Sequence, residues 1–317
     1  MAKYKIDKAF FPFSHFKPPI SRRFLKIVVP HMKPPRKIFR DKALDTVRYE
    51  IESYDGEHIE CFMLSPKGVE ASSPCLIYFH GGGFVLAAAG YHYKNAIRYA
   101  KQGACRVLFV NYRLAPDHPH PVFFEDCYAA VCWAYENANA LGINRSQIGI
   151  GGDSAGATLA VGVCMMARDR HHPIRFVFQM LLYPYLDGRN NSESCKKFTD
   201  TPMWNSTLSE RIASMTRADR SRADYVYYSP VEADSLEGLP PAYIETAEFD
   251  CLHDDGILYA ARLRELGIHV VLNETRGTMH GFDIMQNNRI TRAAILSRIE
   301  FIRSYFSSAE DNSNLVQ

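Results

Sequence analysis

Short apolar runs alternate with segments of helical periodicity over most of the chain. Runs typical of buried strands occupy residues 75–79, 106–110, 147–150, 176–182, 242–246 and 270–272. Helical patterns cover residues 91–102, 123–140, 155–168, 256–265 and 290–306. Strands that alternate with helices favour a mostly parallel sheet with helices on both of its faces. The pattern therefore predicts an α/β fold.

A different pattern precedes these segments. Residues 47–52 and 59–64 alternate polar and apolar side chains, and Asp55 and Gly56 between them are typical of a tight turn. We expect these two strands to form an antiparallel hairpin that opens the sheet. The predicted α/β domain then comprises residues 46–186 and 228–310.

Two segments lie outside this regular pattern. Residues 187–227 are polar and too long for a simple connection, so we interpret them as an inserted cap. Residues 1–45 form a basic arm that two proline pairs interrupt, and we predict that this arm is part of the same cap. Residues 311–317 are expected to be a disordered tail.

The basic arm gives the chain an uneven charge. Residues 1–48 contain 13 Lys and Arg and 3 Asp and Glu, a net charge of +10, although the whole chain carries only +2. Docking of the arm on an acidic body is one interpretation, and contact with an anionic surface or partner is the alternative. The arm has no recognisable nucleic-acid-binding module, so we expect no nucleic-acid partner.

The overall composition is that of a globular protein. Hydrophobic residues make up 47% of the 317 residues and charged residues 23%. The eight cysteines occur singly, without a Cys-x-x-Cys pair, which favours reduced thiols and a cytoplasmic location. No apolar run is long enough for a membrane span, so we expect no integral membrane contact. The histidine pairs 118/120 and 171/172 lack further ligands, and we predict neither a metal nor a cofactor.

The most informative stretch is Gly152-Asp153-Ser154-Ala155-Gly156, which follows an apolar strand pattern directly. In a sharp strand-to-helix turn, glycines two positions before and after the serine relieve crowding against the neighbouring strand and helix. Such a turn would project the Ser154 hydroxyl above the sheet and leave the Ala155 amide at the open start of a helix. Since the same pattern also occurs in Gly/Ser-rich loops, it needs support from elsewhere in the chain.

Three other strand ends supply that support. Gly81, Gly82 and Gly83 follow the strand at 75–79 and expose backbone amides suited to binding an oxyanion. A serine nucleophile also needs a histidine base held by a carboxylate. Asp250 and His280 follow the last two predicted strands, and carboxyl ends of parallel strands meet at one edge. The chain order serine, aspartate, histidine is the order found in α/β-hydrolases.

This combination resembles the hormone-sensitive-lipase-like family of α/β-hydrolases, a group of bacterial carboxylesterases with His-Gly-Gly-Gly ahead of Gly-Asp-Ser-Ala-Gly. The segments at 112–116, 228–230 and 239–242 are similar to those of the family and follow in the expected order. The resemblance covers roughly residues 60–305. The chain departs from the family at Cys251, where proline is usual, and at Ala157, where glycine or asparagine is common.

The resemblance implies roles for individual residues. Ser154 would be the nucleophile, His280 the general base and then acid, and Asp250 the residue that orients the imidazole. The oxyanion hole would use the amides of Gly82, Gly83 and Ala155, with Gly81 shaping the loop. Further candidates for substrate contact are Phe84, Asp153, Met203 and Trp204. For Met203 and Trp204, a place in the core of the cap is an equal alternative.

We therefore expect a serine carboxylesterase that hydrolyses small soluble esters through an acyl-enzyme, with short to medium acyl chains favoured by the resemblance. One alternative is a deacetylase or amidase that acts on acetylated sugars or aryl amides with the same triad. Another is a non-catalytic ligand-binding protein on a hydrolase scaffold, against which the presence of His280 argues. The oligomeric state is left open, with a homodimer as one option.

Overall fold

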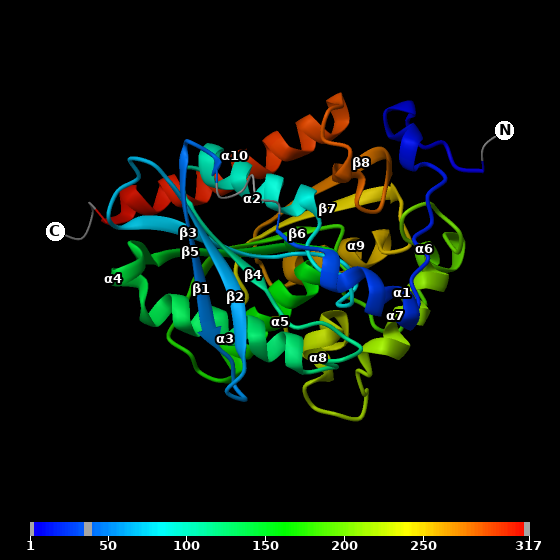
Figure 1. The fold of residues 1–317 in the computed structure, drawn as a ribbon, viewed down its shortest axis with the longest axis horizontal. Helices are drawn as coiled ribbons and strands as arrows, with labels where there is room; N and C mark the ends of the chain where they lie inside the picture. The colour runs from blue at the N-terminus through cyan, green and yellow to red at the C-terminus, as the bar shows by residue number, and fades with distance from the viewer. Residues whose placement is uncertain (1–2, 35–39, 314–317) are drawn as a thin grey trace.

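A single sheet of eight strands runs through the centre of the molecule (Figure 1), as seen in a computed structural model that describes residues 3–34 and 40–313. The strands are β1 (Leu44–Glu52), β2 (His58–Pro66), β3 (Ser73–Phe79), β4 (Arg106–Asn111), β5 (Ile143–Asp153), β6 (Phe176–Leu182), β7 (Ala242–Phe249) and β8 (Val270–Met279). Their order is β1-β2-β4-β3-β5-β6-β7-β8. The first two pairings are antiparallel and the others parallel, which confirms the predicted mostly parallel sheet with an antiparallel opening.

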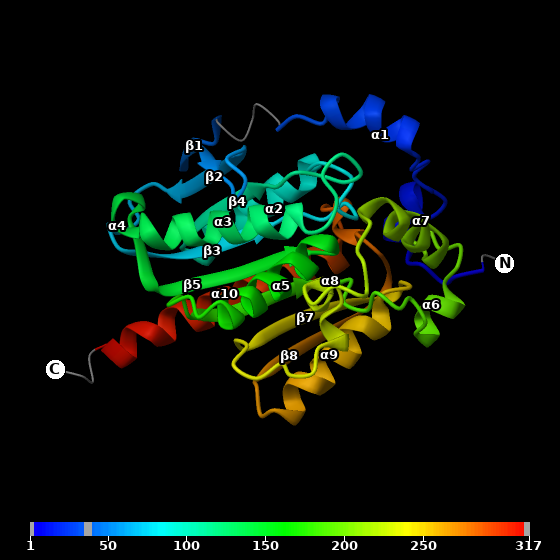
Figure 2. The same cartoon turned by 90° about the horizontal axis from the view of Figure 1, so that it is seen from below.

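Helices cover both faces of the sheet (Figures 1 and 2). On one face lie α2 (Gly90–Gly103) and α10 (Arg289–Ser313), and on the other lie α3 (Val122–Glu136), α5 (Ala155–Asp169) and α9 (His253–Glu265). Alternate side chains of β3 enter the two cores, with Leu76 and Tyr78 on the first face and Ile77 and Phe79 on the second. Burial on both faces explains why the central parallel strands β3 and β4 are almost entirely apolar.

Several predicted element boundaries differ from the structure, and three of the differences are informative. The helix predicted at 123–140 is divided at Asn137, after which the short α4 (Ala138–Leu141) begins. Strand β8 continues seven residues beyond the predicted end at 272, because its polar residues lie on the edge of the sheet, where burial is incomplete. Helix α10 runs to Ser313, so residues 311–313 of the predicted tail are helical, whereas 314–317 lie outside the described residues.

The basic arm and the insertion pack against each other beyond the carboxyl ends of the strands. The arm contains η1 (Lys8–Phe13), α1 (Arg22–Val28) and η2 (Val29–His31), and the insertion contains α6 (Glu193–Lys197), α7 (Ser206–Thr216) and α8 (Tyr225–Tyr228). In Figure 2, α1 lies beside α7. The Met203 amide donates to the Phe16 carbonyl at 2.7 Å, and the Arg211 guanidinium donates to the Ile20 carbonyl at 3.2 Å.

Candidate active site

A sharp turn between β5 and α5 carries Ser154. The serine has φ 54° and ψ −119°, a strained conformation that the surrounding elements hold in place. Any side chain at Gly152 would overlap the backbone of Gly156, and one at Gly156 would overlap the carbonyl of Phe79 on β3. The two glycines are therefore required because strand, turn and helix approach one another at backbone distance.

Ser154, Asp250 and His280 form one chain of hydrogen bonds. The His280 Nε2 atom lies 2.9 Å from Ser154 Oγ, and its Nδ1 atom lies 2.7 Å from Asp250 Oδ2. All three side chains are buried, with Asp250 fully so. The second oxygen of Asp250 accepts the Leu252 amide at 3.0 Å, which fixes the carboxylate. This geometry suits an imidazole whose Nδ1–H group donates to Asp250 and whose Nε2 atom accepts the serine proton.

The neighbouring carboxylates have other partners. Asp254 accepts the amide of Ser194, and Asp255 accepts the amides of Leu186 and Asp187. Burial raises the pKa of Asp255 well above its usual value. Through these hydrogen bonds, Asp254 and Asp255 connect α9 to the start of the insertion. The carboxylate that bonds to His280 is therefore that of Asp250.

The glycine loop after β3 lies against the turn at Ser154. Gly82 and Gly83 have φ of +122° and +62°. Within residues 3–34 and 40–313, no acceptor pairs with the backbone amides of these two glycines. A Cβ atom at Gly82 would lie 2.6 Å from the Leu86 carbonyl oxygen, and one at Gly83 would lie 2.6 Å from Trp204 Cη2. The loop thus carries free donors where a larger residue would not fit.

The buried carboxylate of Asp153 lies against this loop at Gly81. Its side chain is 1% exposed and accepts hydrogen bonds from the Tyr78 hydroxyl at 2.8 Å and from His92 Nε2 at 3.0 Å. Burial raises the pKa of Asp153, but His92 and Tyr78 outweigh that effect and lower it. A Cβ atom at Gly81 would overlap the Asp153 carboxylate. The carboxylate therefore holds the loop in position, and Asp153 also lines the larger of the two cavities at Ser154, so its predicted contact with substrate stays a prediction.

His80 is a structural residue at the start of the same loop. It is 1% exposed, and its ring stacks on Tyr112 with 4.5 Å between centroids. The Tyr112 hydroxyl donates to the His80 carbonyl at 2.7 Å. Burial lowers the pKa of His80 to about 4, so the ring is neutral near pH 7.

Two cavities of unequal size meet at Ser154. The larger, of about 170 Å³, is lined by residues of the arm, the glycine loop and the insertion, together with His280. The smaller, of about 10 Å³, is lined by Gly83, Phe84, Ala155, Tyr185, Trp204 and Tyr228, among others. Trp204 borders both cavities, and its Nε1 donates to Ser209 Oγ at 2.8 Å. Of the predicted pocket residues, Met203 lines the larger cavity and Phe84 the smaller.

Several lining residues were not predicted from the sequence. Tyr183 follows β6 directly and packs edge-on against the His280 ring, at 5.0 Å between centroids. Because Tyr183 directly follows a predicted strand, the sequence pattern could have indicated its place at the site. Phe16, Ile20 and Met32 of the arm also line the larger cavity, but nothing in their local sequence indicates this contact.

Arg113, in the family-like segment 112–116, has a structural role: it forms ion pairs with Asp55 and Asp126, at 2.8 and 2.7 Å. In the part of the chain that the structure describes, no group of three His, Cys, Asp or Glu side chains is arranged to hold a metal ion. No helix within those residues is long and apolar enough to cross a membrane.

Fold and site together define the class of protein. A sequence profile described as alpha/beta hydrolase fold matches residues 76–284. The sheet order, the serine turn after β5 and the hydrogen-bonded histidine after β8 are those of an α/β-hydrolase. More narrowly, the chain belongs to the hormone-sensitive-lipase-like family of α/β-hydrolases, as the sequence predicted.

Named esterases are among the similar proteins. The chain is 35% identical over 217 residues to esterase LipI of Mycobacterium tuberculosis, covering 67% of each chain. It is 35% identical over 234 residues to carboxylesterase NlhH of the same organism, covering 72% of this chain and 73% of the relative. The solved structure of an esterase from Pyrobaculum calidifontis superposes with a TM-score of 0.79 at 30% identity, over 89% of this chain and 92% of that one.

Proposed function

We propose that this protein is a serine carboxylesterase whose nucleophile is Ser154, whose general base and acid is His280, and whose orienting carboxylate is Asp250. The observation that carries the proposal is the unbroken hydrogen-bond chain from Asp250 through His280 to Ser154, beside free amides and two apolar cavities. The similarity to LipI and NlhH supports it. The unpaired cysteines favour a cytoplasmic location.

The geometry accounts for each step of ester hydrolysis. Ser154 Oγ attacks the carbonyl carbon while His280 Nε2 takes the hydroxyl proton. The carbonyl oxygen becomes an oxyanion that accepts hydrogen bonds from the amides of Gly82, Gly83 and Ala155. His280 then gives its proton to the alcohol oxygen as the carbon–oxygen bond breaks. A water molecule attacks the acyl-enzyme in the same way, and the proton returns to Ser154 as the acid leaves.

The two cavities receive different halves of the ester. Because His280 protonates the leaving alcohol, the alcohol must lie in the cavity that His280 lines, which has about 170 Å³. An apolar cavity of about 150 Å³ holds a molecule the size of benzene. The acyl group then lies on the side of Ala155 and Phe84, where the free space is about 10 Å³. We therefore propose acetyl esters of small apolar or aromatic alcohols as the preferred substrates.

Replacement of the nucleophile tests the reaction class. Ser154→Ala should lower kcat for p-nitrophenyl acetate by at least about 10⁴-fold, with an unchanged melting temperature. The matched control is Ser146→Ala, an exposed serine on the same strand, which should keep full activity. Turnover by Ser154→Ala equal to that of the unsubstituted enzyme would exclude the proposed nucleophile.

The two alternatives can be separated from this proposal. A non-catalytic binding protein would not react with a fluorophosphonate probe, whereas the hydrogen-bonded Ser154 should be labelled within minutes and Ser154→Ala should not. A deacetylase or amidase would prefer acetylated sugars or anilides to esters. A panel of acetyl, butyryl and octanoyl p-nitrophenyl esters, acetylated sugars and acetanilide decides between the substrate classes, and we expect the acetyl ester to be hydrolysed fastest.

A further inference from the structure

The described part of the arm, residues 3–34, presents an unusually basic surface. It carries eight Lys and Arg side chains and a single acid, Asp7, and all eight cations are exposed. Lys3 forms an ion pair with Asp200 at 2.6 Å. Among the described residues, the other seven cations have no ion-pair partner; they are Lys5, Lys8, Lys17, Arg22, Arg23, Lys26 and Lys33. The arm thus keeps most of its charge available to an external partner, although it is folded onto the body.

The same segment exposes large apolar side chains. Phe11 is 69% exposed, Phe16 46% and Ile27 59%. They account for three of the eight large hydrophobic side chains that are exposed in the described residues, although the arm contributes only 32 residues. Lys or Arg combined with exposed Phe, Leu or Ile on one segment is typical of proteins that lie in the headgroup region of a membrane. We call residues 3–34 the docking arm.

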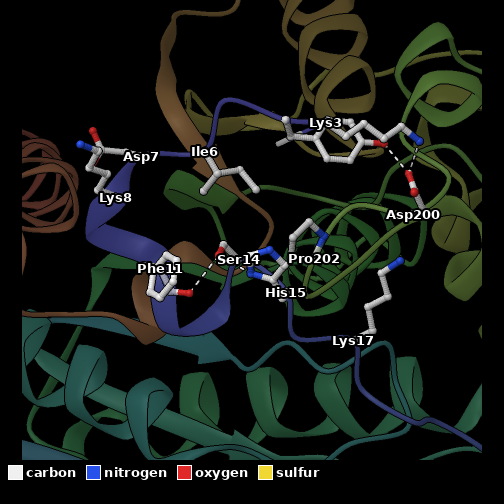
Figure 3. A pocket seen from close by; sticks show the side chains of 11 residues that line it. Lys3, Ile6, Asp7, Lys8, Phe11, Ser14, His15, Lys17, Asp200 and Pro202 are labelled. Atoms are coloured by element: carbon white, nitrogen blue, oxygen red, sulfur yellow. Dashed lines mark hydrogen bonds and ion pairs between the residues drawn. The ribbon is translucent and has the colours of Figure 1, made fainter. Parts of the chain in front are cut away.

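The docking arm also lines the cavity that contains Ser154. A hollow of about 330 Å³ is lined by residues of the arm together with Asp200 and Pro202 of the insertion; Figure 3 shows Lys8, Phe11 and Lys17 around this hollow. Phe16 and Ile20 of the same arm line the cavity that reaches Ser154. One short segment therefore carries exposed cations and exposed apolar side chains and also forms part of the wall of the catalytic cavity.

We propose that the docking arm binds an anionic lipid surface and so brings the catalytic cavity next to apolar esters dissolved in that surface. The binding itself needs only the exposed side chains of the arm, whereas its benefit to catalysis rests on the proposed function. The cations match anionic headgroups in charge, and each contributes independently to binding near such a surface. Exposed Phe11 and Ile27 gain from an apolar medium, which lipid provides and the phosphate backbone of a nucleic acid does not.

Vesicle sedimentation with the full chain tests the docking. The probes are vesicles of phosphatidylcholine alone and vesicles that contain phosphatidylglycerol as well. We expect binding to the anionic vesicles, weakening as salt is raised from 50 to roughly 500 mM because the charges are exposed. The triple variant Lys5→Gln/Lys8→Gln/Lys26→Gln should bind about a hundredfold more weakly. Phe11→Ser/Ile27→Ser should also bind more weakly, at every salt concentration.

A matched control tests whether these losses are specific to the arm. Lys94→Gln/Leu296→Ser removes an exposed cation and an apolar side chain that is 54% exposed, both far from the arm in sequence, and should bind as the unsubstituted protein does. Hydrolysis of soluble p-nitrophenyl acetate should be unchanged in all these variants. Ser154→Ala should bind vesicles normally, which separates failure of the docking from failure of the esterase proposal.

Three outcomes would overturn the proposal. The first is equal binding to neutral and anionic vesicles, or no binding to either. The second is binding that the arm variants and the control variant change to the same extent. The third is that the protein does not bind the anionic vesicles but binds a fluorescent DNA duplex or polyglutamate in a salt-sensitive way. The partner of the arm would then be a nucleic acid or an acidic protein.

Discussion

Replacing Gly81 with alanine is expected to remove most of the esterase activity without unfolding the protein. The added methyl group would overlap the Asp153 carboxylate and lie 2.8 Å from the Asp153 carbonyl oxygen. Ordinary contact begins at 3.4 Å, so the methyl group is at least about 0.6 Å too close. Asp153 cannot move freely, because hydrogen bonds from His92 and Tyr78 hold both oxygens of its carboxylate. The displacement therefore falls on the glycine loop.

The size of the effect follows from what the loop does. A shift of Gly82 and Gly83 moves the free amides away from the oxyanion, and loss of one oxyanion-hole donor typically lowers kcat by about 10²–10³-fold. The oxyanion forms only during the reaction, so the substrate should bind almost as before. We expect kcat for p-nitrophenyl acetate to fall by about 100-fold in Gly81→Ala, with little change in KM.

Steady-state kinetics, active-site titration and circular dichroism measure this effect. Gly68→Ala is the control: Gly68 has φ +77° in a turn, and a Cβ atom there meets nothing within 4 Å. That substitution should cost some stability through its backbone angle and leave kcat unchanged. A folded Gly81→Ala enzyme with kcat close to that of the unsubstituted enzyme would refute the reasoning, because the loop would then tolerate the displacement.

Three further predictions concern buried charge, pocket size and pH. Burial lowers the pKa of Arg298, but Glu245 and Asp283 are among the groups that raise it well above its ordinary value. Arg298→Met would leave these two carboxylates buried without their cation. We therefore expect the free energy of unfolding, measured by urea denaturation, to fall by about 3–5 kcal/mol. Adding Glu245→Gln to that variant should restore part of the loss, and no recovery would argue against uncompensated charge as its cause. Trp204→Ala should join the two cavities and raise the octanoyl-to-acetyl ratio of kcat/KM about tenfold, which an unchanged chain-length profile would contradict. The pKa of His80 is about 4 in the folded protein because of burial, against 6.5 ordinarily, so the unfolded chain binds more protons between these values. The free energy of unfolding should therefore fall by about 3 kcal/mol as the pH drops from 6.5 to 4, and His80→Asn should flatten this dependence.

The residues that meet at Ser154 were accessible to sequence reasoning because of the geometry of parallel strands. Ser154, Asp250 and His280 come after successive predicted strands, and β5, β7 and β8 all end at the same edge of the sheet. The strand order therefore brings these residues together, although the apolar run before His280 ends at residue 272 and the polar rest of β8 carries the chain to the site. The glycines at 81–83 and 152–156 were informative for the same reason, since only backbone contacts at that edge require them.

The buried charges behind the site were not accessible in this way. Arg298 on α10 is fully buried and pairs with Glu245 on β7 and with Asp283 after β8. The partners lie 53 and 15 residues away, and each alone looks like an ordinary surface charge in a helix, strand or loop. Their pairing depends on how α10 crosses the sheet, which no local pattern specifies.

The sequence by itself determined the α/β fold, the family and the residues that share the edge of the sheet, because strand periodicity and backbone crowding are local properties with strong signals. Only the tertiary structure decided the shape of the space above Ser154. Phe16 of the arm and Met203 of the insertion are far apart in the sequence, yet the Met203 amide donates a hydrogen bond to the Phe16 carbonyl, and Trp204 borders both the large and the small cavity. Long-range packing of irregular segments sets those volumes, so substrate size is a property of the folded cap and the reaction class a property of the sheet.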